Sequence, residues 1–396
     1  MDKKPEKLVP EVRFKGFTDD WEQRKLGKSL SLLKDGTHGS YESVQQGAWL
    51  LSAKNIINNR VVITSNDRKI SENDFKKIHD KFQLRKGDVL LTIVGTIGRS
   101  AILKEANKLT FQRSVAYLRP DENILTSSNF LFSLSKSSNF QNQLKKRTVI
   151  SAQPGIYLSD IDKLNITIPE LKEEQDKIAS IIITIDSILS LQQRKLEQLK
   201  QLKKAILQII ASNRLLLHTK KVDMIKVRVA DIYKITRGNV LSRSEISNVR
   251  TSKYPYPVYS SQTKNHGLMG YYKDFLFKNA ITWTTDGANA GTVKYRKGRF
   301  YSTNVNGVLL SSEGLANQLT AELLNLVAFK YVSHVGNPKL MNNTMGEIIF
   351  NIPRSVETQQ YFSGCIESVI DLIGKQEKAT DKLNKLKKYL LQKLFI

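Results

Sequence analysis

The sequence contains one long segment twice. Residues 152–210 align with residues 336–394 at a constant offset of 184 positions, and the alignment needs no gap. Repeats in solenoids and propellers recur about every 20 to 50 residues, so this offset indicates that a whole domain was duplicated with the segment that follows it. Such a chain is suited to contacting two equivalent partners at once. The matched pairs are Pro154 and Pro338, Ile168-Pro169 and Ile352-Pro353, Glu173 and Glu357, Gln175 and Gln359, Gln192 and Gln376, Leu199 and Leu383, Leu202 and Leu386, Lys203 and Lys387, Lys204 and Lys388, and Leu207-Gln208 and Leu391-Gln392.

The second part of each copy predicts a long helix with a coiled-coil seam. In the first copy Pro169 precedes the helix, and acidic residues occupy its first turn, where the helix dipole favours them. Apolar residues then recur at alternating steps of four and three over about four heptads, with a glutamine at the same depth in both copies. Because the seams match, antiparallel pairing of the helices is favoured over packing of each helix on its own domain. The seam residues named for this pairing are Ile182, Leu189, Gln192 and Leu199, and Ile366, Ile373, Gln376 and Leu383.

The positive charge of the chain lies outside the repeated segments. The net charge is +25; residues 1–150 hold 27 Lys/Arg and 16 Asp/Glu (+11), and residues 211–345 hold 19 and 7 (+12), which leaves +2 for the rest. Two basic blocks joined by nearly neutral connectors indicate that each block faces a polyanion such as nucleic acid. The alternative is a basic surface that is only well solvated, and the paired distribution favours nucleic acid over it.

Composition argues against several classes of protein. Cys365 is the only cysteine, so neither a disulfide framework nor a cysteine-based zinc site is expected. The five histidines are scattered, and none forms a His-x-x-x-His pair for a metal. The first residues lack an apolar signal segment, and no apolar run approaches the roughly 20 residues that cross a bilayer. We therefore expect a cytoplasmic protein with no metal site and no membrane partner.

Each basic block has the pattern of an α/β module. In the first block short apolar runs predict strands, and Asn129 to Leu144 predicts a helix. In the second block Lys226 to Ile235 predicts a strand, and Gly314 to Val332 predicts a helix. The order of elements is similar in the two blocks even where the residues differ. Two divergent copies of one module explain this best.

Four phrases give the chain a family resemblance. The opening Arg13 to Glu22 is followed by Lys25-Leu26-Gly27, and two further phrases are the glycine turns at Thr92 to Gly98 and at Asp286 to Val293. The fourth is the twice-used Ile-Pro…Glu-x-Gln before a long helix. Together, and in this order, they make the whole chain resemble the specificity subunit of type I restriction–modification systems.

The resemblance implies an α+β fold: two α/β target recognition domains separated by two long antiparallel coiled-coil helices, with an internal pseudo-two-fold repeat. Each recognition domain would read one half of a split DNA site, and the helical regions would set the gap and dock modification subunits. The ranges expected on this sequence are 1–150 for the first recognition domain, 151–213 for the central repeat helix region, 214–335 for the second recognition domain and 336–396 for the C-terminal repeat helix region.

The sequence predicts a non-catalytic subunit with no cofactor and no catalytic residue. A DNA adenine methyltransferase needs a glycine-rich cofactor loop and an (Asn/Asp)-Pro-Pro-(Tyr/Phe) motif for the flipped base, and neither is present. A Walker loop for ATP is also absent. By the resemblance, the partners on double-stranded DNA are two methyltransferase subunits, which carry S-adenosylmethionine and methylate adenine, and restriction/translocase subunits, which use ATP and Mg.

The residues that contact DNA are expected on turns of the basic blocks, where Arg, Lys, Asn and Gln serve both phosphates and base edges. For each candidate residue, a loop side chain that is only solvated explains the sequence as well as a DNA contact does. The candidates are Lys34, His38, Lys54, Asn55, Thr96, Arg99 and Arg113 in the first block, and Arg237, Asn239, Gln262, Lys264, Asn265, Asn289 and Arg296 in the second.

The sequence leaves two alternatives to a DNA-recognition subunit, each from a different functional class. One is a self-sufficient DNA-modifying enzyme with unrecognised motifs, which S-adenosylmethionine binding by the purified chain would reveal. The other is a coiled-coil RNA-binding scaffold, which competition between duplex DNA and structured RNA would reveal. The target bases do not follow from the sequence, since no general code links side chains of such a module to base identity.

Overall fold

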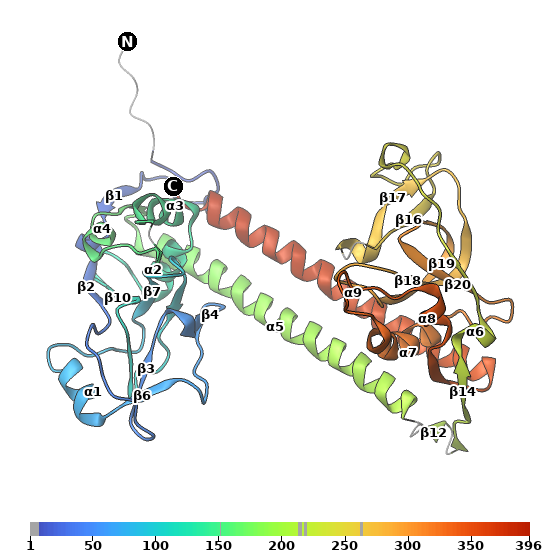
Figure 1. Cartoon of the computed structure of the whole chain (residues 1–396). Helices are drawn as coiled ribbons and strands as arrows, with labels where there is room; N and C mark the ends of the chain where they lie inside the picture. Colours follow the sequence, from blue (N-terminus) through green and yellow to red (C-terminus); the bar gives the residue numbers. More distant parts are fainter. Residues whose placement is uncertain (1–7, 151, 213–215, 218–219, 262–263) are drawn as a thin grey trace, which may run out of the picture. The chain divides into compact units, whose positions relative to one another are not determined.

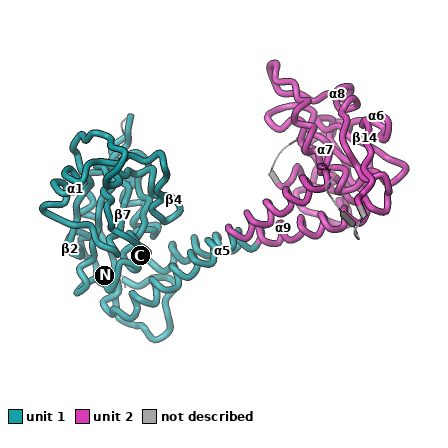
Figure 2. The backbone as a smooth tube through the Cα atoms, turned by 90° about the horizontal axis from the view of Figure 1, so that it is seen from below, with its two compact units in different colours: residues 1–192, 379–396 teal, residues 193–378 magenta. Residues whose placement is uncertain are grey.

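The computed structural model describes residues 8–150, 152–212, 216–217, 220–261 and 264–396. The chain divides into two units: unit 1 is residues 1–192 with 379–396, and unit 2 is residues 193–378 (Figure 2). Two long helices, α5 (Lys172–Ala211) and α9 (Val356–Lys393), each contribute one part to unit 1 and the other part to unit 2.

Unit 1 is built around two small sheets (Figure 1). The larger is antiparallel with strand order β2-β10-β7-β8, and the smaller has the order β6-β3-β9, in which β3 and β9 are parallel. A separate pair, β1 and β11, connects the opening segment to the start of the repeat helix. The strands are β1 (Glu22–Lys25), β2 (Leu30–Asp35), β3 (Ala48–Leu51), β4 (Ile56–Ile57), β5 (Arg60–Val61), β6 (Arg68–Ile70), β7 (Val89–Thr92), β8 (Ser100–Ile102), β9 (Leu109–Phe111), β10 (Val115–Pro120) and β11 (Asn165–Ile168); the short helices are α1 (Glu72–Ile78), α2 (Ser128–Ser135), α3 (Ser138–Arg147) and α4 (Leu158–Asp162).

The two faces of the larger sheet in unit 1 pack into different cores. Leu91 and Leu118 face a core that includes Phe130 of α2 and Phe140 of α3. Alternate residues of the same strands, such as Leu90, face a second core that lies against the smaller sheet. A strand that is covered on both faces needs apolar residues at nearly every position. The sequence of β7, Val89–Thr92, has this composition, and all four of its residues are buried.

Unit 2 repeats this plan with one continuous sheet in the order β15-β20-β18-β19-β16-β17. Its strand β19 pairs with β18 and also, in parallel, with β16, so it takes the places of both β8 and β9. The elements are β12 (Leu216–Leu217), β13 (Lys220–Lys221), β14 (Met224–Arg228), α6 (Val229–Ile232), β15 (Lys234–Arg237), β16 (Tyr256–Tyr259), β17 (Leu268–Tyr272), β18 (Phe277–Thr284), β19 (Val293–Ser302), β20 (Asn306–Leu310), α7 (Gln318–Ala328), α8 (Asn342–Gly346) and β21 (Ile349–Pro353).

Helices α5 and α9 pair antiparallel within each unit. In unit 1 Asp186 of α5 forms an ion pair with Lys387 of α9, and in unit 2 Lys200 pairs with Glu377 at 2.9 Å. The residue number rises along α5 where it falls along α9. Of the seam residues named from the sequence, Ile182, Leu189, Ile366 and Gln376 are buried, and Gln192, Leu199, Ile373 and Leu383 are half-buried.

The repeated Ile-Pro…Gln phrase is a clamp between a strand and the long helix that follows it. Gln175 and Gln359 are both fully buried. The Gln175 Nε2 donates to the carbonyl of Pro169 at 2.8 Å, and the Gln359 Nε2 donates to the carbonyl of Pro353 at 2.7 Å. A buried amide that caps the strand end fixes where the helix leaves the domain, which explains why the phrase occurs in both copies.

The predicted fold class is confirmed, and two expected elements are corrected. The helix expected over Asn129 to Leu144 is two helices, because Ser137 accepts a hydrogen bond from the backbone N of Phe140 and starts a new helix. The strand expected over Lys226 to Ile235 is interrupted by the short helix α6. Val229 N donates to the carbonyl of Ile348 at 2.9 Å, and the chain turns there.

Candidate nucleic-acid interface

A glycine loop in each unit is tied to the start of the repeat. The term denotes residues 93–98 in unit 1 and 285–291 in unit 2. Gly95 N donates to the carbonyl of Pro154 at 2.8 Å, and Gly287 N donates to that of Pro338 at 2.9 Å. These two glycines have φ of +79° and +90°, which glycine adopts without strain. The aligned prolines of the repeat therefore hold the same loop in both units.

In unit 1 this loop borders a pocket that brings together two of the residues predicted from the sequence. His38 and Arg113 line it, and both are exposed. Arg113 N donates to the carbonyl of Thr37 at 3.0 Å, which joins the turn after β9 to the turn after β2. His38 Nε2 lies 2.5 Å from Asp35 Oδ2. Thr96 is exposed on the glycine loop itself.

Three other candidates of unit 1 make contacts within their own domain. The Lys34 ammonium lies 5.0 Å from the centre of the Phe82 ring. Lys54 is exposed and forms an ion pair with Asp67 at 3.1 Å. Asn55 is buried, where it accepts from Ser52 N at 3.0 Å and donates to the carbonyl of Val62 at 2.9 Å. Both ends of the Asn55 amide are therefore used inside its own loop.

Arg99 lies in a second pocket of unit 1. Its side chain is exposed, and its backbone N donates to Thr92 Oγ1 at 2.9 Å. Lys136 lines the same pocket, and burial, followed by the charge of Lys387, lowers the pKa of Lys136 to about 8. Lys136 contacts the Phe132 ring at 5.2 Å. This pocket is therefore basic but keeps one of its cations partly desolvated.

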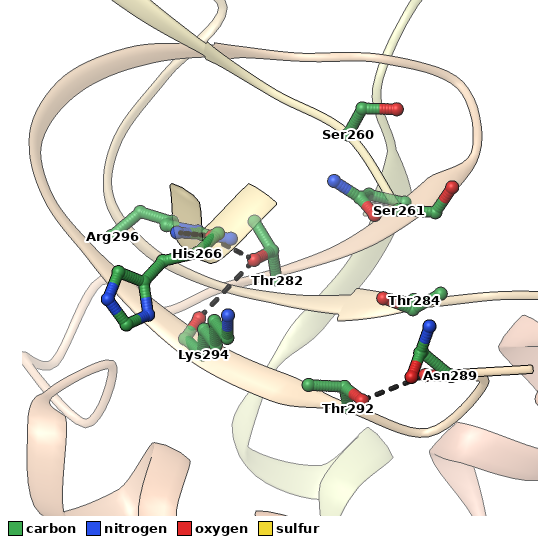
Figure 3. Close-up of a pocket in the computed structure, with 10 residues that line it drawn as sticks. Ser260, Ser261, His266, Thr282, Thr284, Asn289, Thr292, Lys294 and Arg296 are labelled. Carbon is green, nitrogen blue, oxygen red and sulfur yellow. Dashed lines mark hydrogen bonds between the residues drawn. The ribbon is translucent and has the colours of Figure 1, made fainter. Parts of the chain in front are cut away.

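In unit 2 Asn289 and Arg296 line one pocket together with His266 (Figure 3). Asn289 is exposed on the glycine loop. Arg296 departs from its predicted place on a turn, because β19 continues past Tyr295 to Ser302 and carries Arg296 inside the sheet. The Arg296 side chain is buried, and its guanidinium stacks on Tyr259 with 3.7 Å between the guanidinium carbon and the ring centre.

The other candidates of unit 2 are dispersed. Arg237 is exposed on β15, and Asn239 is exposed just after Gly238. Asn265 is exposed with φ of +48° in the short turn before β17. Gln262 lies outside the described residues, and of Lys264 only the backbone is described.

Sequence reasoning missed the inner wall of the unit 2 pocket. Thr282 and Thr284 of β18 and Lys294 of β19 line it beside Arg296, and Asn306 of β20 closes it. The signal was present as alternation, since Thr282 and Thr284 alternate with Ile281 and Trp283, and Lys294 and Arg296 alternate with Val293 and Tyr295. In unit 1 the pocket at Arg113 also includes Gln153 and the exposed Tyr157, which the sequence did not single out.

A family model decides the family. The model described as "Type I restriction modification DNA specificity domain" matches residues 42–201 and again residues 221–386. The chain belongs to the type I restriction–modification DNA specificity family. The first match takes in most of unit 1 and of α5, and the second takes in most of unit 2 and of α9.

Curated relatives agree over part of their length. A protein of Mycoplasma pneumoniae, named as the N-terminus of a putative type I specificity subunit, is 43% identical over 124 residues, which are 31% of this chain and 65% of that protein. The type I restriction enzyme MpnII specificity subunit of the same organism is 34% identical over 159 residues, which are 39% of this chain and 44% of that protein. This chain therefore spans less than two thirds of these relatives.

A solved structure shows the same fold. The S subunit of a type I restriction–modification system from M. genitalium superposes with a TM-score of 0.74 at 17% identity, over 98% of this chain and 99% of that one. Over the residues that the structure describes, no helix is both long and apolar enough to cross a membrane. Nor do the described residues bring together three or more His, Cys, Asp or Glu side chains as metal ligands.

Proposed function

We propose that the chain is the DNA-recognition subunit of a type I restriction–modification complex, in which each unit reads one half of a bipartite target. The observation that carries the proposal is the duplicated frame. Equivalent hydrogen bonds hold equivalent glycine loops in both units, while the side chains on and beside those loops differ. A constant frame with variable side chains is what two readers of different half-sites require.

Unpaired cations near the loops support DNA as the ligand. Arg99, Arg113 and Arg237 are exposed, and none of the three forms an ion pair with any described residue. Exposed guanidinium groups of this kind can neutralise phosphates or read guanine edges. Affinity should therefore fall with salt by about 0.9 log unit per phosphate contact for each tenfold rise in salt concentration.

The test is to change one unit and read both half-sites. A variant with Thr96→Ala, Arg99→Ala and Arg113→Ala is expressed with its modification subunits, and the methylated sites are mapped genome-wide. We expect the half-site read by unit 1 to be lost or relaxed and the other half-site to stay unchanged. Each lost base contact should reduce discrimination by about 1 to 3 kcal/mol.

The matched control carries Lys28→Ala and Lys163→Ala. Both lysines are exposed in unit 1 beyond the end of β2 that lies away from the glycine loop. This control removes two positive charges, as the loop variant does, and it should leave both half-sites unchanged. A loop variant that alters both half-sites, or a control that alters one, would contradict separate reading by the two units.

We further propose that methyl transfer and cleavage are supplied by partner subunits, which carry S-adenosylmethionine, ATP and Mg, and that two copies of the modification subunit dock on the helix pair. Support comes from apolar residues at the same repeat position on both helices. Ile188 and Leu386 are exposed in unit 1, and their repeat equivalents Leu372 and Leu202 are exposed in unit 2. All four flank the helix seam, so each unit offers the same pair.

Docking is tested by removing one pair at a time. Ile188→Asp with Leu386→Asp should reduce the assembled complex from two modification subunits to one, as measured by mass photometry of the purified complex. Leu202→Asp with Leu372→Asp should do the same on the other side. Gln193→Asp, on the other flank of α5, is the control and should leave two subunits bound. Full assembly of both double variants would contradict docking at these residues, and binding of S-adenosylmethionine to the chain alone would contradict supply by partners.

A further inference from the structure

Strand register allows unit 1 and unit 2 to be compared position by position. Thr92 N donates to the carbonyl of Arg99, and Thr284 N donates to that of Thr292, so Thr92 corresponds to Thr284. In unit 1 Leu90 pairs with Ala101, and at the corresponding positions of unit 2 Thr282 pairs with Lys294. By the same register Leu103 corresponds to Arg296, Val115 to Asn306 and Leu51 to Tyr259.

These corresponding positions have opposite chemistry in the two units. In unit 1 Leu90, Ala101 and Leu103 are at most 1% exposed and belong to the core between its two sheets. In unit 2 the same positions are Thr282, Lys294 and Arg296, and they line a pocket instead (Figure 3). The space that a water-sized sphere can occupy within the pocket is about 20 Å³, so the pocket admits one small polar group rather than a drug-sized ligand.

The unit 2 pocket holds two cations and no acidic residue among its described lining. Arg296 is fixed by neutral groups: its Nε donates to Thr282 Oγ1 at 3.1 Å, and its Nη1 donates to the carbonyl of His266 at 3.0 Å. Among the described residues, Lys294 forms neither an ion pair nor a side-chain hydrogen bond. The carboxylate that acts on it, Glu322, is already paired with Lys203 at 2.6 Å.

Burial of these cations is unfavourable unless an anion pairs with them. Desolvation lowers the pKa of Arg296 to about 10, and desolvation, followed by the charge of Arg296, lowers the pKa of Lys294. Buried charges in proteins are normally paired, because an unpaired one loses its hydration without compensation. The hydroxyls of Ser260 and Thr284 line the same space and add neutral donors, whereas Thr292 Oγ1 donates to the carbonyl of Asn289 at 2.8 Å. Cations and hydroxyl donors around a small pocket match the needs of a tetrahedral oxyanion.

We propose that this pocket of unit 2 is a binding site for an oxyanion of the phosphate class, filled either by a backbone phosphate of bound DNA or by free inorganic phosphate. Only the first source rests on the proposed function. Unit 1 has no counterpart, since apolar side chains fill the corresponding space. The two units therefore differ in ligand chemistry as well as in surface residues.

The first experiment measures phosphate binding by the full chain without DNA. Inorganic phosphate is compared with chloride at equal ionic strength by thermal unfolding and by isothermal titration calorimetry. We expect phosphate to raise the Tm of unit 2 by about 3 °C or more and to bind with one site per chain. The variant with Lys294→Ala and Arg296→Leu, which copies unit 1, should lose this response and bind phosphate at least about tenfold more weakly.

Two further variants separate loss of the site from loss of the fold. Lys294→Ala alone changes a half-buried side chain and should weaken phosphate binding while Tm in chloride stays within about 2 °C. Lys234→Ala with Lys278→Ala removes two exposed lysines from the same sheet and should leave phosphate binding unchanged. No phosphate response in the native chain, or an equal response in the pocket variants, would overturn the proposal.

The second experiment identifies the source. Phosphate is titrated into the chain already saturated with target duplex. Loss of the phosphate signal, with the pocket variant binding duplex at least about tenfold more weakly, assigns the site to a backbone phosphate. An unchanged phosphate affinity assigns it to the free anion. If the chain fails to bind duplex, the proposed function falls while the titration without DNA still decides the pocket.

Discussion

Unit 1 and unit 2 share a hydrogen-bonded frame and differ in what that frame encloses. Both hold a glycine loop by the carbonyl of an aligned proline, and both turn the chain after the first sheet strand at a glycine, Gly36 or Gly238. A Cβ on Gly36 would lie 2.2 Å from the carbonyl oxygen of Phe111, and one on Gly238 would lie 2.0 Å from that of Ser302. The frame depends on backbone atoms, so side chains around it can diverge without changing the fold.

The units also differ in how one strand is completed. In unit 1 residues 103–108 separate β8 from β9, whereas in unit 2 β19 runs without a break from Val293 to Ser302. A bulge opposite Lys278 and Ala280 and a positive φ at Gly298 let β19 serve both neighbours. The comparison teaches that the enclosed space, apolar in unit 1 and cationic in unit 2, is where the two copies have specialised.

The largest effect is expected when the charge of unit 2 is placed in unit 1. Leu103→Arg puts an unpaired cation into a core where Leu103 is 1% exposed, and it should lower the free energy of unfolding of unit 1 by about 4 kcal/mol. Chemical denaturation followed by hydrogen exchange of β7 and β8 measures it. Leu103→Met is the control and should cost less than about 1.5 kcal/mol. A loss below about 1 kcal/mol in the arginine variant would show that unit 1 can also accommodate a charge here.

Replacing the buried glutamine of each clamp should reduce the free energy of unfolding in proportion to the hydrogen bonds that the glutamine makes. Gln175 accepts from Thr126 N at 3.0 Å and donates to the carbonyls of Ile124 and Pro169, whereas Gln359 donates to Pro353 and accepts from Asn317 Nδ2 at 3.2 Å. Gln175→Leu should cost about 3 kcal/mol and Gln359→Leu about 2 kcal/mol, because buried partners are left unsatisfied. Denaturation of each variant, with hydrogen exchange to locate the loss, measures the difference. Equal costs would mean that the bonds unique to Gln175 contribute nothing.

The glycine loops should respond equally in the two units. Gly95→Ala and Gly287→Ala each put a Cβ at positive φ, with no heavy atom within 4 Å of it, so the cost is backbone strain alone, about 1 kcal/mol in each case. Gly364→Ala in α9 is the matched control, and it should stabilise by about 0.5 to 1 kcal/mol because alanine favours helix. Thermal unfolding of the three variants is the measurement. A loop variant that is neutral in one unit only would mean that its loop relaxes.

The smallest effects belong to the ion pairs between α5 and α9. The side chains of Lys387 and Asp186 are 16% and 17% exposed, and those of Lys200 and Glu377 are 48% and 37% exposed. Lys387→Met should therefore cost about 1 kcal/mol and Lys200→Met about 0.5 kcal/mol or less. Denaturation at low salt and at 1 M salt checks this, since salt screens the exposed pair more strongly. A larger cost for Lys200→Met would reverse the comparison.

Much of the frame could be predicted from the sequence, because its determinants are local. The proline pairs, the glycines and the seam residues recur at one offset, and each acts through the backbone or through one helix face. The pocket could not be predicted, because its residues meet only through strand register. The two glycine turns align Leu90 with Thr282, but that alignment does not show which strands lie beside them, and Arg296 was expected on a turn, whereas β19 continues past it to Ser302. DNA contacts stay predictions, since exposure alone does not select among polar loop side chains.

The division of the chain into units also sets an order of folding during synthesis. Unit 2 is one continuous stretch, whereas unit 1 needs residues 379–396, which follow residue 192 only after the whole of unit 2 has been made. Leu390, Leu394 and Phe395 lie in the unit 1 core with Ile182 and Leu189. At about 5 to 20 residues per second, ribosomes need roughly 10 to 40 s to supply them. For that time Ile182 and Leu189 of α5 lack these three partners in the unit 1 core, so the nascent chain carries a complete unit 2 while unit 1 is still missing the end of α9.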